Sequence, residues 1–385
     1  MAKIIYLDHH ATTPVDPKVL KKMLPYFGRR FGNPASRTHA LGSESEKAVE
    51  KARAQIASLI GAESKEIVFT SGATESINLA LKGAAEANKD RGNHVITAVT
   101  EHRAALDSCK RLEMAGFEVT DLPVKQDGLI DLDELKKAIT PKTILISVMF
   151  ANNEIGVIQP VAQIGRIAKK AGVLFHCDAA QALGKVTIDV KAMNIDLLSI
   201  TAHKIYGPKG VGALYVRKTG PPQVKLLPIL DGGGHEGGFR SGTLNVPGIV
   251  GFGEACELYS KQNLLKEEPK KLVKLRDRLE SLLLKNIPGC RVNGSTTSRL
   301  PNNLNVSLEG VDAKSLMAKL KGIALSSGSA CLSSSDEPSY VLKALGLPEA
   351  LRRSSLRFGL GRFNTTAEID ETAKRVIIAV RALRK

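Results

Sequence analysis

Short apolar runs alternate with amphipathic stretches through the first two thirds of this chain. The apolar runs are rich in Val, Ile, Leu and Phe, which is typical of strands that are buried on both faces. We predict strands at residues 67–69, 94–96, 143–149, 173–175 and 196–200, preceded by a strand-like Ile4–Leu7.

The stretches between these runs have the composition and spacing of helices. Several begin beside Ser, Thr or Asp, which commonly cap helices. We predict helices at residues 73–88, 104–115, 132–139 and 161–171, and an earlier helix with one buried stripe at 48–60. Strands that alternate with crossover helices indicate a mostly parallel sheet.

The pattern changes after about residue 258. A long charged helix is predicted to residue 284, then a strand at 302–306 and an amphipathic helix at 369–383. A single core stops growing near ~250–300 residues, so 385 residues predict two domains. We place a large domain at residues 16–258 and a small α+β domain at residues 1–15 and 259–385.

Charge and composition narrow the class of protein. Lys and Arg outnumber Asp and Glu by 55 to 39, a formal net charge of +16, which favours anionic ligands or partners. The densest basic tracts, 266–278 and 374–385, mix acidic or apolar residues at helical spacing, as solvated helix faces do. Since aromatic residues make up 4% and Trp is absent, direct nucleic-acid binding is not expected.

The chain contains no apolar run of the roughly 18 residues that a membrane span requires, and no signal-peptide core follows Met1. We therefore expect a cytoplasmic protein. Its five cysteines are scattered without a C-x-x-C pair, which predicts reduced thiols and no zinc site of the protein's own.

Three features suggest chemistry. Residues 70–75 (TSGATE) lead from a strand through a small-residue turn into a helix, which could bind phosphate or simply cap the helix. Asp178 stands at the end of a predicted buried strand, where open α/β sheets bind ligands, although such an Asp can also be a helix cap. Lys204 follows another strand end and could form a Schiff base or lie on a surface turn.

In this order, the three features resemble the class V, fold-type I enzymes that use pyridoxal 5'-phosphate (PLP), specifically the cysteine desulfurases of the IscS and NifS group. The resemblance runs from residues 7–14 to 357–363 and includes 70–75, 152–156 and 326–331. It implies a fold-type I PLP-transferase. It also implies an enzyme that converts L-cysteine to L-alanine and transfers sulfur to an enzyme cysteine, for iron–sulfur cluster assembly or other thiolation.

The resemblance assigns roles residue by residue. Lys204 should bind PLP covalently, Asp178 should stabilise its protonated ring nitrogen, and His102 should stack on the ring. The phosphate should be bound by Ala73, Thr74, Thr201 and His203, and the ring hydroxyl by Gln181. Asn153 should lie beside the ring and the substrate, whose carboxylate should be bound by Arg357 and Asn33. Thr243 should contact the phosphate of the cofactor in the other subunit of a homodimer.

Cys331 is the predicted sulfur acceptor. Residues 326–338 around it contain little apolar material, which favours a mobile loop that can carry a thiol to the substrate. By resemblance, the sulfur then goes to an iron–sulfur scaffold protein or another acceptor, and Cys331 could also ligate a cluster shared with the scaffold. We assign no catalytic role to His9 or His10.

Two alternatives stay open at this point. Another class V PLP enzyme, such as an aminotransferase, would share Lys204 and Asp178 but would have no use for a mobile thiol. A basic protein that binds nucleic acid or an acidic partner would explain the positive charge without any catalysis.

Overall fold

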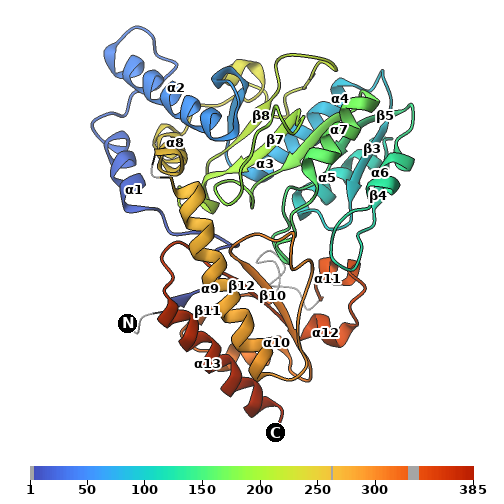
Figure 1. The fold of residues 1–385 in the computed structure, drawn as a ribbon. Helices are drawn as coiled ribbons and strands as arrows, with labels where there is room; N and C mark the ends of the chain where they lie inside the picture. Colours follow the sequence, from blue (N-terminus) through green and yellow to red (C-terminus); the bar gives the residue numbers. More distant parts are fainter. Residues whose placement is uncertain (1–3, 262, 328–337) are drawn as a thin grey trace.

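The computed structural model describes residues 4–261, 263–327 and 338–385, so Cys331 lies outside the described residues. A large sheet with helices on both faces forms one part of the molecule, and a smaller group of strands and helices lies beside it (Figure 1). Within these ranges, no helix combines the length and the apolar character that a membrane crossing needs.

The large sheet has seven strands in the order β2-β8-β7-β6-β5-β3-β4. Within this sheet, β8 runs opposite to the other six strands, so the predicted mostly parallel sheet is confirmed. The strands are β2 (Ile67–Thr70), β3 (His94–Ala98), β4 (Glu118–Leu122), β5 (Thr143–Ser147), β6 (Leu174–Asp178), β7 (Leu197–Thr201) and β8 (Gly212–Val216).

Alternate residues of each central strand enter two different hydrophobic cores. Phe175 and Ile146 face one core with α2, α6, α7 and α8, whereas Leu174 and Leu145 face the other with α3, α4 and α5. The helices are α1 (Pro17–Met23), α2 (Ala40–Ile60), α3 (Ala73–Asn78), α4 (Ala84–Ala87), α5 (Arg103–Met114), α6 (Leu132–Ala138), α7 (Val161–Ala171) and α8 (Val246–Lys261). The sheet is therefore buried between two helical layers, which confirms the α/β class.

A third core lies in the smaller part of the molecule and contains Ile5 and Leu7 together with residues from 272 to 380. Its strands form a parallel pair, β1-β11, and an antiparallel sheet in the order β12-β10-β9. The elements are β1 (Ile5–Tyr6), α9 (Leu264–Asn286), β9 (Cys290–Val292), β10 (Asn303–Leu308), α10 (Ala313–Lys319), β11 (Ile323–Ala324), α11 (Tyr340–Ala344), α12 (Glu349–Arg353), β12 (Ser355–Gly359) and α13 (Thr366–Leu383).

Two predicted helices differ from the structure. The helix predicted at 73–88 contains a π-helical turn, Leu79–Gly83, between α3 and α4. The helix predicted at 258–284 is replaced by the end of α8 and the whole of α9, with Asn263 in a left-handed conformation (φ 53°) before α9. The predicted domain boundary at residue 258 falls inside α8, and the division into two domains stays a prediction.

Candidate active site

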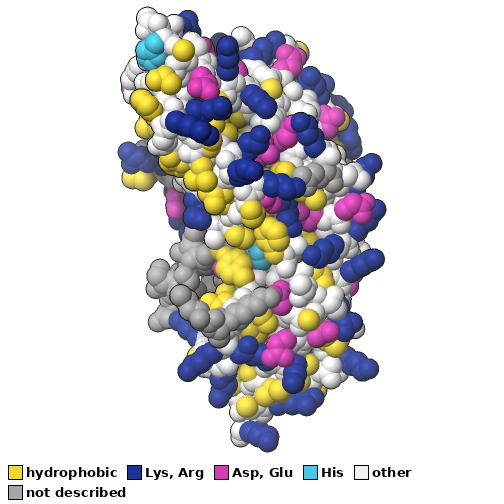
Figure 2. Space-filling view, turned by 90° about the vertical axis from the view of Figure 1, so that its left-hand side faces the viewer, with side chains coloured by type: hydrophobic (Ala, Val, Ile, Leu, Met, Phe, Trp, Pro, Cys, Tyr) yellow, Lys and Arg dark blue, Asp and Glu magenta, His cyan; other side chains and the backbone are white. Residues whose placement is uncertain are grey.

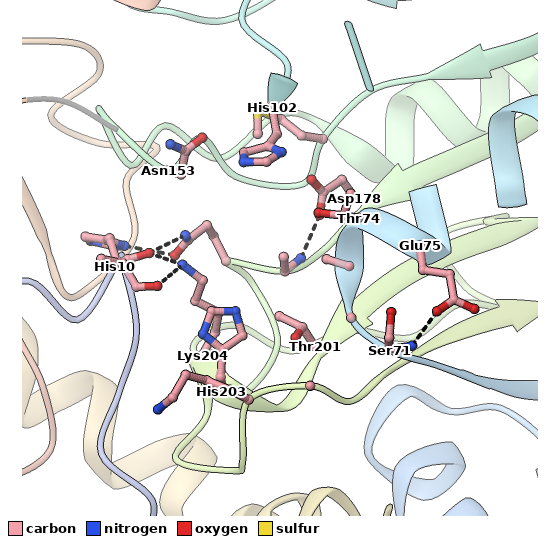
Figure 3. A pocket seen from close by; sticks show the side chains of 18 of the residues that line it. His10, Ser71, Thr74, Glu75, His102, Asn153, Asp178, Thr201, His203 and Lys204 are labelled. Carbon is pink, nitrogen blue, oxygen red and sulfur yellow. Dashed lines mark hydrogen bonds between the residues drawn. The ribbon is translucent and has the colours of Figure 1, made fainter. Parts of the chain in front are cut away.

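A cavity of about 360 Å³ opens at the carboxyl ends of β6 and β7, where α/β sheets bind their ligands. Figure 3 shows it from close by. Ten of the sequence-predicted site residues line it: Ala73, Thr74, His102, Asn153, Asp178, Gln181, Thr201, His203, Lys204 and Arg357. The fold thus brings together side chains from segments that are far apart in the chain.

The turn between β2 and α3 forms one wall of the cavity. Glu75 stabilises the turn, because its Oε2 accepts a hydrogen bond from Ser71 N at 2.8 Å. Gly212 on β8 approaches the turn so closely that an added Cβ would lie 2.7 Å from Gly72 Cα. The first turn of a helix leaves N–H groups without intrahelical acceptors, so the turn can bind an anion at Ala73 and Thr74.

Asp178 ends β6 and is 4% exposed. Its Oδ1 accepts from Ala180 N at 2.9 Å. Burial raises the pKa of the Asp178 carboxyl, and the nearby His102 and Lys204 charges act against this rise. A buried carboxyl of this kind favours a cationic or proton-donating partner inside the cavity.

His102 caps the N-terminus of α5, and its Nδ1 accepts from Ala104 N at 3.1 Å. Because Nδ1 is the acceptor, a neutral His102 ring carries its proton on Nε2. Figure 3 shows His102 in the cavity wall near Asp178. Asp178 is the last residue of β6 and His102 follows β3, so both lie at the carboxyl ends of strands of the same sheet.

Lys204 ends the 3₁₀ turn Ala202–Lys204 that follows β7. Its Nζ donates hydrogen bonds to the backbone carbonyls of Ala11, at 2.8 Å, and of His10. The preceding His203 bonds through Nδ1 to Thr12 Oγ1 at 3.1 Å. Burial, assisted by the charges of Lys204 and other lysines, lowers the pKa of His203 to about 4, so this ring is neutral near pH 7.

Arg357 on β12 is 1% exposed. Its Nη1 donates to Asn153 O at 2.9 Å, and its Nη2 donates to Asp8 Oδ1 at 2.7 Å. Two buried polar atoms of the cavity wall, Arg357 Nε and Asn153 Oδ1, have no hydrogen-bond partner among the described residues. Such atoms are costly unless a ligand or water satisfies them.

Two predicted site residues do not line the cavity. Asn33 is exposed, and its Oδ1 accepts from Ala35 N at 3.0 Å. Thr243 is exposed in a loop that two partly buried ion pairs tie to the body of the protein, Arg53–Glu236 and Arg240–Glu75.

Cys331 lies outside the described residues, but the chain on either side of the undescribed residues 328–337 contacts the cavity region. Arg357 N donates to Ser326 O at 2.7 Å. Ser339 Oγ donates to Glu154 Oε2 at 2.5 Å, and Tyr340 Oη donates to Glu101 O at 2.6 Å. Glu154 and Glu101 are the chain neighbours of the cavity residues Asn153 and His102.

Sequence reasoning missed His10, which lines the cavity and is 1% exposed. It also missed Asp8, which pairs with Arg357. The available signal was the run of polar residues directly after a predicted strand, which predicts a turn but does not say what the turn contacts. Among the described residues, no group of three or more His, Cys, Asp or Glu side chains could hold a metal ion.

The fold and the cavity define a class. Residues 5–372 match the family model "Aminotransferase class-V", and the chain belongs to this family. The class V, fold-type I architecture predicted from the motifs is thereby confirmed.

Comparison with individual proteins narrows the class. Over 99% of the chain, the sequence is 56% identical to "Cysteine desulfurase IscS" of Anaeromyxobacter sp. (strain K), covering 93% of that protein, and 53% identical to "Cysteine desulfurase" of Mus musculus, covering 82%. The solved structure "NIFS-LIKE PROTEIN" has a TM-score of 0.91 and 39% identity, covering 98% of this chain and 100% of that one. The solved structure "SspA in complex with cysteine" has a TM-score of 0.82 and 38% identity, and the match covers 94% of this chain and 100% of that one. Within its family, the chain is a member of the IscS and NifS cysteine desulfurases, as the motifs predicted.

Proposed function

We propose that this chain is a PLP-dependent cysteine desulfurase that converts L-cysteine to L-alanine and transfers the sulfur to Cys331 as a persulfide. The observation that carries the proposal is the meeting of Lys204, Asp178 and His102 around one cavity in a chain of this family. In an aminotransferase the same three residues would serve, but relatives at 51–56% identity carry the name cysteine desulfurase.

The residues around the cavity fit PLP. The Lys204 amine suits the aldehyde, the Asp178 carboxyl suits the ring nitrogen, and Gln181 suits the ring hydroxyl. The turn at Ala73 and Thr74 suits the phosphate, together with Thr201 and His203. The unpaired Asn153 Oδ1 and Arg357 Nε are a further reason to expect a polar ligand. PLP, when bound, supplies an electron sink for bond cleavage at the substrate Cα.

The protein's own residues then have separate tasks. Arg357, with Asn153 and the proposed Asn33, holds the substrate carboxylate, and Asp8 fixes one end of its guanidinium group. Lys204 takes the proton from Cα as general base. With PLP bound, Asp178 would keep a proton at the ring nitrogen, and His102 would cover the ring face.

Sulfur transfer requires a thiolate from Cys331. The thiolate attacks the substrate sulfur, an S–S bond forms, and the Cβ–S bond breaks with its electron pair left on carbon. Protonation of that carbon gives alanine, so one cysteine and one thiol become one alanine and one persulfide. The contacts of Ser326 with Arg357 and of Ser339 with Glu154 support this role, because they hold the flanking chain beside the cavity.

The partners follow the same reasoning. Thr243 is exposed on an anchored loop, which supports a contact with the cofactor of a second subunit in a homodimer. The persulfide sulfur would pass to an iron–sulfur scaffold protein or another thiol acceptor, and Cys331 could share a cluster with that scaffold. The cytoplasmic location and the lack of direct nucleic-acid binding stay predictions.

The test is to mix the purified protein with L-cysteine and to measure alanine and sulfide. Cys331→Ser should keep the visible absorbance of bound PLP and its response to cysteine, while sulfide release falls about 100-fold or more, as for loss of a covalent nucleophile. Cys290→Ser, at a half-buried thiol, is the matched control and should keep its activity. Unchanged sulfide release by Cys331→Ser would overturn the persulfide step, and transamination without sulfide would overturn the desulfurase activity.

A further inference from the structure

A hydrogen-bond network beside the cavity joins the antiparallel sheet to Gln181. Asn303 on β10 donates through Nδ2 to Glu154 O and shares a contact with His10 Nε2, both at 3.1 Å. His10 Nδ1 then lies 2.9 Å from Gln181 Oε1, and Gln181 Nε2 donates back to His10 O at 3.0 Å. Figure 3 shows His10 beside Lys204 at the cavity, with dashed lines for hydrogen bonds between the residues drawn there.

Two backbone carbonyls fix the direction of every bond in this network. A carbonyl oxygen only accepts, so the amide atom that faces Glu154 O must be the Asn303 nitrogen, and the one that faces His10 O must be the Gln181 nitrogen. The second Asn303 N–H therefore donates to His10 Nε2. Gln181 Oε1 then faces His10 Nδ1, which must carry a proton. The network is satisfied by one form of His10, the neutral ring protonated on Nδ1.

Burial and charge maintain this form. His10 is 1% exposed, and burial, followed by the positive charge of Arg357, lowers its pKa well below the ordinary value. Lys185 and Lys204 lower the pKa further, and only the Gln181 bond acts in the opposite direction. Rotating the Gln181 amide by half a turn would place two acceptors together at His10 O and two donors together at Nδ1. The amide therefore has one stable orientation, and the His10 ring enforces it.

We propose that His10 is a positioning residue that holds the Gln181 amide in a single orientation for the ring hydroxyl of PLP. The inference rests on the proposed function, since it concerns the same cavity. Gln181 is 5% exposed and lines the cavity, so the orientation of its amide decides which atom a ligand meets. A side chain whose supporting bonds are fixed before binding loses less freedom when the ligand arrives.

Two substitutions of His10 separate the contribution of its ring from that of its backbone carbonyl. His10→Leu removes the ring but keeps the carbonyl that accepts from Gln181 and Lys204. His10→Asn restores an N–H close to the former Nδ1. His9→Leu is the matched control, because the neighbouring ring is also buried (4% exposed) but bonds through Nδ1 to Gly359 O instead of Gln181.

The first measurement is the affinity of the full-length, cofactor-stripped protein for PLP, followed by visible absorbance. We expect His10→Leu to bind PLP about tenfold more weakly, equivalent to about 1.4 kcal/mol. His10→Asn and His9→Leu should stay within about twofold of the wild type. Equal affinities for His10→Leu and the wild type would refute the positioning role.

The second measurement needs no cofactor. The ¹⁵N spectrum of the stripped protein labelled at histidine should contain a neutral, Nδ1-protonated ring that disappears in His10→Asn and persists in His9→Leu. His9, whose Nδ1 faces the Gly359 carbonyl, should give a second ring of this form that shows the opposite response. If the signal that is lost in His10→Asn belongs instead to an imidazolium or to an Nε2-protonated ring at pH 7, the inference is overturned. Failure of the wild type to bind PLP, with the expected spectrum intact, would instead overturn the proposed function.

Discussion

Arg362, which follows β12, is held by groups from distant parts of the chain. Its Nε donates to Glu268 Oε2 at 2.8 Å, and its Nη1 donates to Asp16 Oδ2 at 2.9 Å. The guanidinium carbon also lies 4.2 Å from the ring centre of Tyr206 and 5.1 Å from that of Tyr259. The Arg362 side chain is 13% exposed, so these interactions are poorly screened by water.

Replacement by Met keeps an apolar stem but removes the charge from two carboxylates that stay largely buried. Breaking a buried ion pair by removing one partner costs about 3–5 kcal/mol. Loss of cation–π contacts costs about 0.5–2 kcal/mol more, and the effects are not additive. We therefore expect Arg362→Met to lower the free energy of unfolding by about 4 kcal/mol.

The chain supplies a matched surface pair. Arg278 binds a single carboxylate through two nitrogens, which lie 2.5 and 2.9 Å from the Asp370 oxygens, and the two side chains are 49% and 41% exposed. Water and salt screen exposed pairs, so Arg278→Met should lower the free energy of unfolding far less than Arg362→Met does.

Urea unfolding followed by circular dichroism measures the free energy of unfolding of both variants. The slope of that free energy against urea concentration shows whether a substitution has also changed the surface area exposed on unfolding. In ~1 M salt, where charges are screened beyond about 3 Å, the small Arg278 effect should vanish and most of the Arg362 effect should persist. Equal costs for the two substitutions would refute the reasoning that burial sets the strength of these pairs.

Two further substitutions test the cavity surroundings. Burial lowers the pKa of Lys185 to about 8 from 10.5, so its unfolded form binds more protons between these values and stability rises with pH there. Lys185→Met should therefore stabilise the protein at pH 7 and lose this advantage by pH 10.5 in urea titrations; a pH-independent difference would contradict the assignment. Gly212→Ala places a Cβ 2.7 Å from Gly72 Cα and should weaken PLP affinity about tenfold, whereas Gly28→Ala, with nothing within 4 Å, should not.

Five of the seven strands of the large sheet were predicted, because a strand buried on both faces is a short apolar run with turn residues after it; β4 and β8 were not predicted. The apolar composition of a buried strand does not indicate its direction, so the sequence of β8 does not predict that it runs antiparallel to β7 and β2. The π-helical turn Leu79–Gly83 was also hidden, because an extra residue per turn leaves the apolar composition of a helix unchanged. Topology and local irregularity therefore came only from the structure.

The site was predictable where chemistry follows a strand end. Asp178 and Lys204 end β6 and the turn after β7, so the rule about carboxyl ends of parallel strands placed them in one cavity. Asn33 and Thr243 follow no such strand end, and their exposed positions in a single chain leave their assigned roles as predictions. The sequence alone assigned no role to His10, because the proposed role depends on Gln181, which is 171 residues away.

The turn at residues 8–13 shows why a polar sequence can be buried near an active site. Its side chains form hydrogen bonds with two different parts of the protein: Asp8 with Arg357 on β12, and Thr12 with His203 beside β7. Each buried polar atom needs such a hydrogen-bond partner. A segment that lies between two cores is therefore polar, because its side chains bond to polar groups at the edges of both cores. Because Lys204 Nζ and the Gln181 amide both donate to His10 O, this turn also fixes where the proposed cofactor ligands lie before any ligand binds.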